Sequence, residues 1–384
     1  NLSLQRGRIH EFFKYTKPHR KLLEQIELVI IDEISMVRAD IIDAIDRILR
    51  VYSHNLREPF GGKQLLLVGD VFQLEPVVKN DEREILNRFY PTPYFFSARV
   101  FGQIDLVSIE LQKVYRQTDP VFVGVLDHIR TNTAGAADLQ LLNTRYGSQI
   151  EESEADMYIT LATRRDTVDS INEKKLAELP GESITFEGVI EGDFPESSLP
   201  TSQELVLKPG AQIIFIKNDF DRRWVNGTIG VIAGIDEEEE TIYVITDDGK
   251  ECDVKRDSWR NIRYRYNEKT KEIEEEVLGS FTQYPIRLAW AITVHKSQGL
   301  TFSRVVIDFT GGVFAGGQAY VALSRCTSLD GIQLKKPINR ADIFVRPEIV
   351  NFAGRFNNRQ AIDKALKQAQ ADVQYAAVAR AFNK

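Results

Sequence analysis

Two carboxylates follow a short apolar run near the start of the sequence. Residues 28–33 read LVIIDE, so a buried strand would deliver Asp32 and Glu33 at its carboxyl end. Nucleotide hydrolysis needs one carboxylate to hold Mg²⁺ and a second to orient or deprotonate the attacking water. Asp32 and Glu33 fit these two roles. The alternative is that they open a helix, since Asp is a good N-cap and Glu suits a first turn.

A second apolar run, LLLVGD at 65–70, ends in the same way, and Gln73 follows it. If both runs are neighbouring strands of one sheet, the Gln73 amide would lie near the phosphate that Asp32 and Glu33 serve and could sense its loss. The alternative is an ordinary Gly-Asp turn. Two polar strand ends in one sheet favour the functional interpretation.

The elements needed to position these residues alternate along the chain. Apolar runs separated by amphipathic helices predict parallel sheets covered on both faces. Between the first two strands, residues 36–52 carry apolar side chains at helical spacing. A second α/β unit is expected from about residue 104. Its predicted strands are 104–109, 158–163 and 304–309, and its predicted helices are 119–130, one from about 166, and 288–299.

The stretch from about 180 to 284 has a different pattern. Its short β runs, separated by Gly, Asp and Asn turns, predict a small antiparallel barrel inserted into the second α/β unit. The acidic run at 236–240 is expected at a hairpin tip rather than at a metal ion. An Ala-rich amphipathic helix is expected over 357–383, and the sequence does not specify its partner.

The composition of the chain limits the classes of protein to which it can belong. The chain has 384 residues, 43% hydrophobic and 27% charged, with a formal net charge of −7, which excludes wholesale disorder and argues against a uniformly basic DNA-coating protein. A motor with a locally positive groove remains compatible. Cys252 and Cys326 are too few for a disulfide framework, and a cytoplasmic location is the expectation. No apolar run reaches about 18 residues, so no membrane span is expected.

Five segments occur in an order typical of one enzyme family. They are DEISM (32–36), PFGGKQLLLVGDVFQLEPV (59–77), YRQTDP (115–120), TVHKSQGLTF (293–302) and YVALSR (320–325). They resemble motifs II to VI of the superfamily 1B helicases of the Pif1 group, related to RecD- and Dda-type enzymes. The segment at 59–77 resembles the signature of the Pif1 group itself. The resemblance covers roughly residues 25–345.

The resemblance implies an α/β fold with two RecA-like parallel-sheet domains, the first truncated at its N-terminus, and an inserted SH3-like β-barrel. The expected domains are a partial first RecA-like domain (1–100), the second RecA-like domain in two parts (101–180 and 285–346), the inserted SH3-like domain (181–284) and a helical tail (347–384).

The family's activity is ATP-dependent 5′-to-3′ unwinding of DNA, with ATP and Mg²⁺ as cofactors and single-stranded DNA and DNA forks as partners. A monomer is expected. By resemblance, Asp32 would hold Mg²⁺, Glu33 would act as the catalytic base, and Gln73 would contact the γ-phosphate. Arg116 and Arg325 would act as arginine fingers, since a planar guanidinium neutralises developing phosphoryl charge. The alternative for each Arg is a surface salt bridge. Gln298 and Gly299 are assigned to the nucleotide side.

The candidates for DNA binding are basic, hydroxyl or aromatic side chains near strand ends and turns: Thr163, Arg164, Arg222, Arg223, Trp224, Thr293, His295 and Lys296. Arg beside an aromatic ring suits single strands, through phosphate charge and base stacking. Trp224 fits the core of the small barrel equally well. The alternative for His295 is a capped or solvent-facing imidazole.

The chain departs from the family pattern at the phosphate-binding loop. No G-x-x-x-x-G-K-[S/T] motif occurs in the 384 residues, and Gln64 follows the GGK of 61–63 where Ser or Thr is needed. Truncation and natural loss of the ATPase both explain this, and the start at Asn1 favours truncation. We therefore expect that this chain alone does not hydrolyse ATP. The alternatives are a non-catalytic nucleic-acid-binding protein on the same scaffold and, more weakly, a RecD-type recombination subunit. Glu75 also replaces a usual Pro and adds negative charge.

Overall fold

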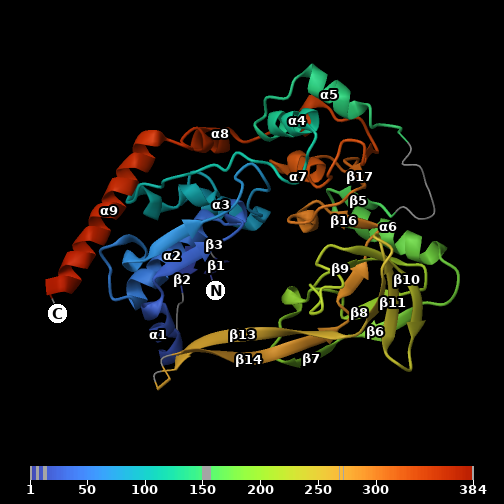
Figure 1. The fold of residues 1–384 in the computed structure, drawn as a ribbon, viewed down its shortest axis with the longest axis horizontal. Coiled ribbons are helices and arrows are strands. Elements are labelled where there is room, and N and C mark those ends of the chain that lie inside the picture. Colours follow the sequence, from blue (N-terminus) through green and yellow to red (C-terminus); the bar gives the residue numbers. More distant parts are fainter. Residues whose placement is uncertain are drawn as a thin grey trace. The chain divides into compact units, whose positions relative to one another are not determined.

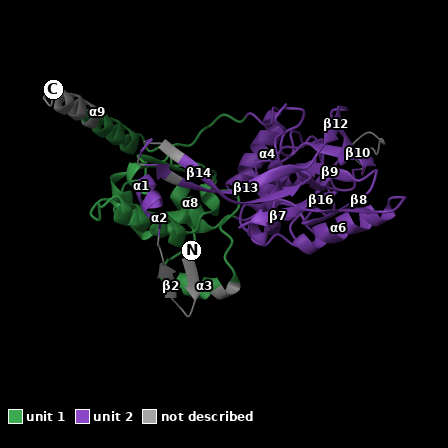
Figure 2. Cartoon of the chain, turned by 90° about the horizontal axis from the view of Figure 1, so that it is seen from below, with its two compact units in different colours: residues 1–14, 23–114, 345–384 green, residues 15–22, 115–344 purple. Residues whose placement is uncertain are grey.

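The computed structural model describes residues 2–5, 8–11, 15–148, 157–267, 269–270 and 272–382. The chain divides into two compact units, which Figure 2 colours separately. Unit 1 comprises residues 1–14, 23–114 and 345–384, and unit 2 comprises residues 15–22 and 115–344. The five-part domain division expected from the sequence remains a prediction.

Unit 1 is built on a two-stranded parallel sheet, as its sequence predicts. Strands β3 (Leu28–Ile31) and β4 (Gln64–Leu67) are joined through α2 (Ala39–Tyr52). The register pairs Leu28 with Gln64 and Ile31 with Leu67, so both strands end at the same edge of the sheet.

The other elements of unit 1 flank this sheet in the sequence. They are β1 (Leu2–Gln5), β2 (Arg8–Glu11), η1 (Ile34–Met36), η2 (Pro59–Gly62), α3 (Asn80–Asn87), η3 (Phe95–Ser97), η4 (Arg99–Gly102), α8 (Pro347–Ala353) and α9 (Arg359–Phe382). β1 and β2 form an antiparallel hairpin, and α9 confirms the single helix expected over 357–383 (Figure 1). The residues of α1 (Lys17–Gln25) are divided between the two units.

The core of unit 1 joins segments that are far apart in the sequence. One face of the β3–β4 sheet packs with Ile42 and Leu49 of α2. The aromatic residues of η3 and α8 continue this core: the Phe352 ring stacks on Phe96 with centroids 4.4 Å apart and meets Phe95 edge-on at 5.5 Å. Residues after 345 therefore complete the core of this unit.

The opposite face of the β3–β4 sheet is not covered by the described residues. Its aliphatic side chains have exposed fractions between 44% and 59%: Leu28, Ile30, Leu66 and Val68. The sequence predicts coverage of both faces, and the structure covers one.

Unit 2 contains a four-stranded parallel sheet in the order β16 (Ala291–Thr293), β5 (Ile159–Ala162), β17 (Val305–Asp308) and β18 (Ile332–Leu334). All four residues of β5 are buried, as expected for a central parallel strand. Its helices and turns are α4 (Pro120–Arg130), α5 (Ala136–Asn143), α6 (Arg165–Glu178), η6 (His295–Ser297), α7 (Gln318–Ser324) and η7 (Arg340–Asp342). The strands predicted at 158–163 and 304–309 and the helices predicted at 119–130 and from about 166 are confirmed.

The helix predicted at 288–299 is wrong. This segment leaves β15 (Ile286–Leu288), forms β16 and ends in the single turn η6. A short run of buried apolar residues suits a core strand and a buried helix equally well, so its pattern alone could not decide. The strand pairing decided it, because Thr160 N donates to Trp290 O at 2.8 Å and Ile292 pairs with Leu161.

The strand predicted at 104–109 is also wrong. Ser108 O accepts a hydrogen bond from Asn357 N at 2.9 Å, and Glu110 N donates to Asn357 Oδ1 at 2.9 Å. These backbone groups therefore bind the turn before α9 rather than a neighbouring strand, and Ile109 is 67% exposed.

The stretch from 180 to 284 is antiparallel β structure, as predicted. Its elements are β6 (Ile184–Glu187), β7 (Val189–Gly192), η5 (Glu196–Ser198), β8 (Glu204–Leu207), β9 (Gln212–Phe215), β10 (Ile229–Asp236), β11 (Thr241–Thr246), β12 (Glu251–Val254), β13 (Asp257–Asn267) and β14 (Glu272–Gln283). The sheets are ordered β12-β11-β10-β9-β15, β13-β14-β7 and β6-β8. The turn between β10 and β11 carries the acidic run, as expected. An SH3-like closure of these sheets remains a prediction.

Among the helices of the described residues, none has both the length and the apolar character that crossing a membrane requires.

Candidate functional site

The carboxylates after β3 lie beside the end of β4 in unit 1. Val68 N donates to Ile31 O at 2.9 Å, and Ile34 N donates to Val68 O at 3.0 Å, which continues the ladder past the strands. Asp32 is exposed, and its Oδ1 accepts a hydrogen bond from Glu33 N at 2.8 Å. Neither side chain caps α2, whose N-cap residue is Arg38. Glu33 is the N-cap residue of the single turn η1 but makes no side-chain cap hydrogen bond there, so the helix-cap alternative holds for its position and not for a capping interaction.

Backbone conformation at this edge is unusual in two places. Glu33 has a φ of 50°, in the left-handed region that residues other than glycine seldom adopt. Gly69 has a φ of 152°, and a Cβ there would lie 2.9 Å from Ile34 N. Glycine at position 69 thus lets the end of β4 approach the two residues after β3.

Gln73 lies in the turn that follows. Gln73 N donates to Asp70 O at 3.0 Å, and Phe72 N donates to Asp70 Oδ1 at 3.1 Å. Asp70 therefore accepts both of the hydrogen bonds that close this turn. Phe72 and Leu74 are buried on either side, which leaves the half-buried Gln73 between two anchors. The Gly-Asp turn is therefore present, and a γ-phosphate contact of the Gln73 amide stays a prediction.

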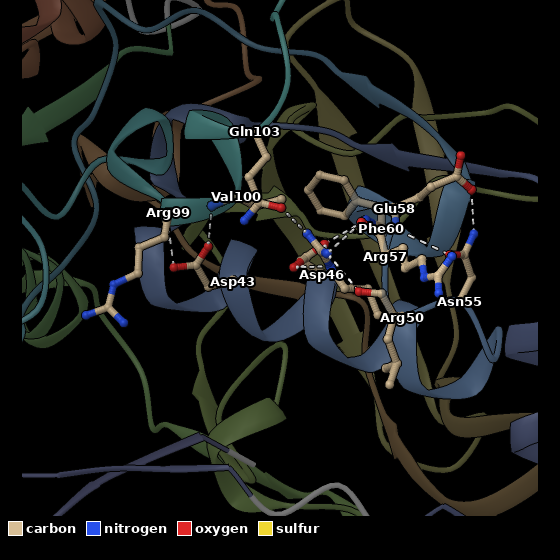
Figure 3. Close-up of polar contacts among 11 residues, drawn as sticks. Asp43, Asp46, Arg50, Asn55, Arg57, Glu58, Phe60, Arg99, Val100 and Gln103 are labelled. Atoms are coloured by element: carbon tan, nitrogen blue, oxygen red, sulfur yellow. Dashed lines mark hydrogen bonds and ion pairs between the residues drawn. The ribbon is translucent and has the colours of Figure 1, made fainter.

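A polar network fixes the start of β4 to α2 (Figure 3). Asp46 Oδ1 accepts a hydrogen bond from Phe60 N at 2.6 Å, and both oxygens of Asp46 accept from Arg50 Nε at 2.8 Å. Arg50 also donates to Leu56 O and to Gln103 Oε1. Phe60 is buried with a φ of 53°, so this network holds the PFGG turn in a conformation that its sequence would not adopt alone.

Two further contacts fix this part of unit 1. Lys63 Nζ donates to Glu24 O at 3.0 Å and to Ile26 O, just before β3. Glu75 accepts from the Tyr94 hydroxyl at 2.7 Å and lies 3.6 Å from Arg346 Nε. The Glu75 carboxylate therefore interacts with Tyr94, just before η3, and with Arg346, just before α8.

The two predicted arginine fingers lie close together in unit 2, around Ser324. Arg116 donates from Nε to Thr301 Oγ1 at 2.9 Å and from Nη1 to Ser324 O at 3.3 Å. Arg325 is 1% exposed and donates from Nε to Val321 O and from Nη2 to Ser324 Oγ, both at 3.0 Å. Both of these hydrogen bonds of Arg116 go to uncharged oxygens, and burial lowers its pKa. For Arg116, the surface salt-bridge alternative is not what the structure shows.

The segment from Thr293 to Gly299 leaves the carboxyl end of β16. Val294 N donates to Ala162 O at 2.9 Å, and Lys296 N donates to Thr293 Oγ1 at 3.2 Å. Burial lowers the pKa of the half-buried His295 imidazole, which favours its neutral form. Gln298 follows η6, and Gly299 takes a φ of 79°.

A PIF1-like helicase family model matches residues 9–124. The ATP-dependent DNA helicase Pif1 of Campylobacter jejuni is 33% identical over 329 residues, which are 82% of this chain and 70% of that protein. The chain belongs to the PIF1-like helicase family. Human ATP-dependent DNA helicase PIF1 is 35% identical over 312 residues, 80% of this chain and 45% of the human protein, so the chain spans about half the length of this relative.

Solved Pif1 structures agree with this assignment. The structure of Bacteroides Pif1 in complex with ADP-AlF4 is 41% identical, with a TM-score of 0.80 over 88% of this chain and 77% of that one. Candida albicans Pif1 is 28% identical, with a TM-score of 0.68 over 87% of this chain and 78% of that one. The two RecA-like parallel-sheet domains expected of the family fit the α/β units described here.

In this PIF1-like chain, Trp224 is a core residue, so of the two roles that the sequence left open for it the structure shows the one in the core. Its ring is 5% exposed and stacks on Phe215 with centroids 4.4 Å apart, while Nε1 donates to Lys217 O. Arg223 lies over this ring and is paired with Asp219 and Asp253, each at 2.8 Å. Arg222 is exposed, with a φ of 60°.

The candidates after β5 differ from each other. Thr163 is 3% exposed, and its hydroxyl is buried without a hydrogen-bond partner in the structure. Arg164 donates through Nε and Nη2 to Asp166, with a shortest distance of 2.7 Å. A phosphate contact from Thr163 would therefore need the surrounding loop to move, whereas Arg164 would have to share its donors with Asp166.

The donor set after β3 suits a hard divalent cation. Mg²⁺ takes oxygen ligands and is commonly bound through one or two carboxylates together with substrate phosphates. The exposed carboxylate of Asp32 is such a ligand. In the part of the chain that the structure describes, no group of three or more His, Cys, Asp or Glu side chains is arranged to hold a metal ion.

Sequence reasoning missed residues that hold the arginine pair. Gln117 is buried, and its Nε2 donates to Ser324 O at 3.0 Å and to Cys326 O at 2.8 Å, on both sides of Arg325. Thr301 and Ser324 supply the hydroxyl oxygens. Gln117 and Ser324 are sequence neighbours of the two arginines, which is the signal that could have identified them.

Proposed function

We propose that this chain acts in ATP-dependent unwinding of DNA, as a helicase that moves 5′ to 3′ along single-stranded DNA. The observation that carries the proposal is that Arg116 and Arg325 both bind Ser324 in unit 2. In unit 1 of the same chain, Asp32 and Glu33 directly follow strand β3. The relatives named ATP-dependent DNA helicase support it. A cytoplasmic location without membrane attachment goes with this function.

In this proposal each candidate residue has a separate role at one bound nucleotide. Asp32 holds Mg²⁺, which when bound neutralises phosphate charge. Glu33 takes the proton of the attacking water, and Gln73 contacts the γ-phosphate. Arg116 and Arg325 neutralise the charge that develops on the transferred group. Gln298 and Gly299 lie on the nucleotide side.

On the DNA side, Thr293, His295 and Lys296 bind the backbone of a single strand, with Arg164 and Arg222 as further contacts. Solved structures described as Bacteroides Pif1 bound to ssDNA, and as Pif1 helicases at forked double-stranded DNA, support single strands and forks as partners. We propose that the protein acts as a monomer.

We further propose that this chain alone does not hydrolyse ATP. Backbone N–H groups of a phosphate-binding loop normally cradle the phosphates, and the 384 residues carry no such motif. Purified chain with oligo(dT), ATP and Mg²⁺ is expected to release phosphate at the rate of a no-protein blank. Stimulated release that Asp32→Ala abolishes would contradict this.

A chimera tests the motor itself. The chain preceded by the phosphate-binding segment of a bacterial Pif1 relative is expected to gain ssDNA-stimulated ATPase activity, which Glu33→Gln or Arg325→Ala removes. A folded chimera that binds oligo(dT) but stays inactive would favour the alternative, a non-catalytic nucleic-acid-binding protein. The missing phosphate-binding motif is the observation that keeps this alternative.

A further inference from the structure

A cavity within unit 2 lies between the antiparallel β structure and the segment that leads into β17. Its volume is about 320 Å³, at the lower end of the usual range for ligand cavities, roughly 300–1,000 Å³. The β structure contributes residues 225–229 and Asp247, which directly follows β11. Residues 299–304 and Met157 supply the rest of the lining.

Hydrogen bonds fix the two main segments of the lining. Val225 N donates to Thr228 Oγ1 at 3.1 Å, and Thr228 N donates to Val225 O at 3.0 Å. In the other segment, Leu300 N donates to Ser297 O at 3.0 Å. The segments touch at Gly227, where the φ is 98° and a Cβ would lie 2.8 Å from Leu300 Cδ2. The walls are therefore held in place by contacts within the chain.

Asp247 is the acidic residue of this lining, and it differs from its neighbour Asp248. The Asp248 carboxylate accepts hydrogen bonds from Thr246 Oγ1 and Lys250 Nζ. Among the described residues no side chain donates to Asp247, whose carboxyl interacts with backbone N–H groups of its own turn. Asp247 is exposed as a residue, yet partial burial of its carboxyl group raises its pKa, and the charge of Asp248 raises it further. A cation beside Asp247 would oppose both effects.

We propose that this cavity binds a small organic ammonium ion, with its charge at Asp247 and its apolar body against Val225 and Leu300. An ammonium group forms charge-assisted hydrogen bonds with a carboxylate, and the apolar side chains remove the body of the ligand from water. Arg304, the basic residue of the lining, already has a partner within the chain. The site lies within one unit and goes beyond the proposed function, on which it does not depend.

An occupant of this cavity contacts the segment that both arginines bind. Thr301 Oγ1 accepts from Arg116 Nε at 2.9 Å, and Leu300 O accepts from Arg325 Nη1 at 3.3 Å. Both acceptors belong to the residues 299–304 of the lining. Binding is therefore expected to slow hydrogen exchange in residues 299–304 and 225–229.

The test titrates the full chain with two probes of similar shape, phenethylamine and phenethyl alcohol, by isothermal titration calorimetry. The amine carries an ammonium group where the alcohol carries a hydroxyl group. The wild type is expected to bind the amine roughly tenfold more tightly, as for a hydrogen bond to a charged group. Asp247→Asn keeps the size of the side chain and is expected to abolish this preference. Hydrogen exchange with and without the amine locates the site.

Asp248→Asn is the matched control. It makes the same change of charge one position further along the chain, at a carboxylate that Thr246 and Lys250 already hold. Its preference for the amine is expected to equal that of the wild type. Circular dichroism melts establish that each variant is folded, and the two probes on the wild type test the role of charge without any substitution.

Four outcomes would overturn the inference and leave the proposed function standing. They are a wild type that does not bind the amine, equal affinities of the wild type for the two probes, an Asp247→Asn variant that keeps the preference, and slower exchange confined to other segments. A capped lysine peptide that binds more tightly than the amine would overturn the assignment to a small molecule and make this cavity a docking site for a protein side chain.

Discussion

Three adjacent residues of the inserted domain are all candidate DNA contacts by sequence, but they differ in burial and in their partners. Arg222 is exposed, Arg223 is held by two aspartates, and Trp224 stacks on Phe215 in the core. A side chain that already fills a core or satisfies two carboxylates has less to offer a DNA strand. Of the three, Arg222 is therefore the residue that we retain as a DNA contact.

His295 gives a prediction about pH. Because burial lowers its pKa below the ordinary value of 6.5, the unfolded chain binds a proton at this site more readily than the folded chain does. The contribution of neutral His295 to stability is therefore present above pH 6.5 and is lost as the pH falls through the unfolded and then the folded pKa. Urea unfolding at pH 7.5 and 5.5 measures this. His295→Gln is expected to show a smaller loss of stability between the two pH values than the wild type.

Lys296→Gln serves as the comparison for this measurement, since it changes the next residue and keeps the imidazole of His295 in place. It should keep the wild-type difference between the two pH values. If His295→Gln keeps that difference as well, the buried neutral imidazole is not responsible for it.

At the scale of elements, the PFGG turn depends on one carboxylate of α2. Asp46→Ala removes the acceptor of Phe60 N and the partner of Arg50. We expect the free energy of unfolding to fall by about 2–3 kcal/mol, the usual range for a hydrogen bond to a charged group in a partly buried place. Urea unfolding measures the loss, and hydrogen exchange is expected to rise in β4.

Glu84→Ala is the control, because its pair with Arg88 also joins positions i and i+4 of a helix but is exposed on both sides. Its effect should stay within about 0.5 kcal/mol. Equal losses in the two variants would show that Asp46 does not hold the turn.

Secondary structure was predicted correctly where the sequence pattern fits only one kind of element. Residues 28–31 and 159–162 are continuous apolar runs that precede amphipathic helices, and both are parallel strands. Residues 288–294 are mostly apolar too, but the pairing of residues 291–293 with β5 is a long-range contact that no local pattern contains. Residues 104–109 alternate like a strand, yet their backbone binds Asn357, about 250 positions away. Candidate site residues were found through their motifs, whereas the contacts that hold them, such as those of Gln117 with the backbone oxygens of Ser324 and Cys326, became visible only in the structure.

At the scale of the whole molecule, each unit has its own core. Phe352 of α8 packs in the aromatic core of unit 1, and Phe281 is fully buried in unit 2. Phe352→Ala is expected to cost about 3–5 kcal/mol in unit 1. Hydrogen exchange followed by mass spectrometry should show faster exchange in α2, with β10 and β11 unchanged.

Phe281→Ala is the reciprocal variant and should speed exchange in β13 and β14 while leaving α2 as it was. Parallel losses across both units in either variant would mean that the chain unfolds as one cooperative block.

The face of the β3–β4 sheet that the described residues leave uncovered has a consequence for handling the protein. Four aliphatic side chains next to one another on this face are about half exposed and form an apolar patch that can associate with other apolar surfaces. Raising the concentration of a kosmotropic salt such as ammonium sulfate would screen the repulsion between copies and strengthen apolar association at the same time. Dilute, low-salt buffers are thus the conditions in which single molecules persist.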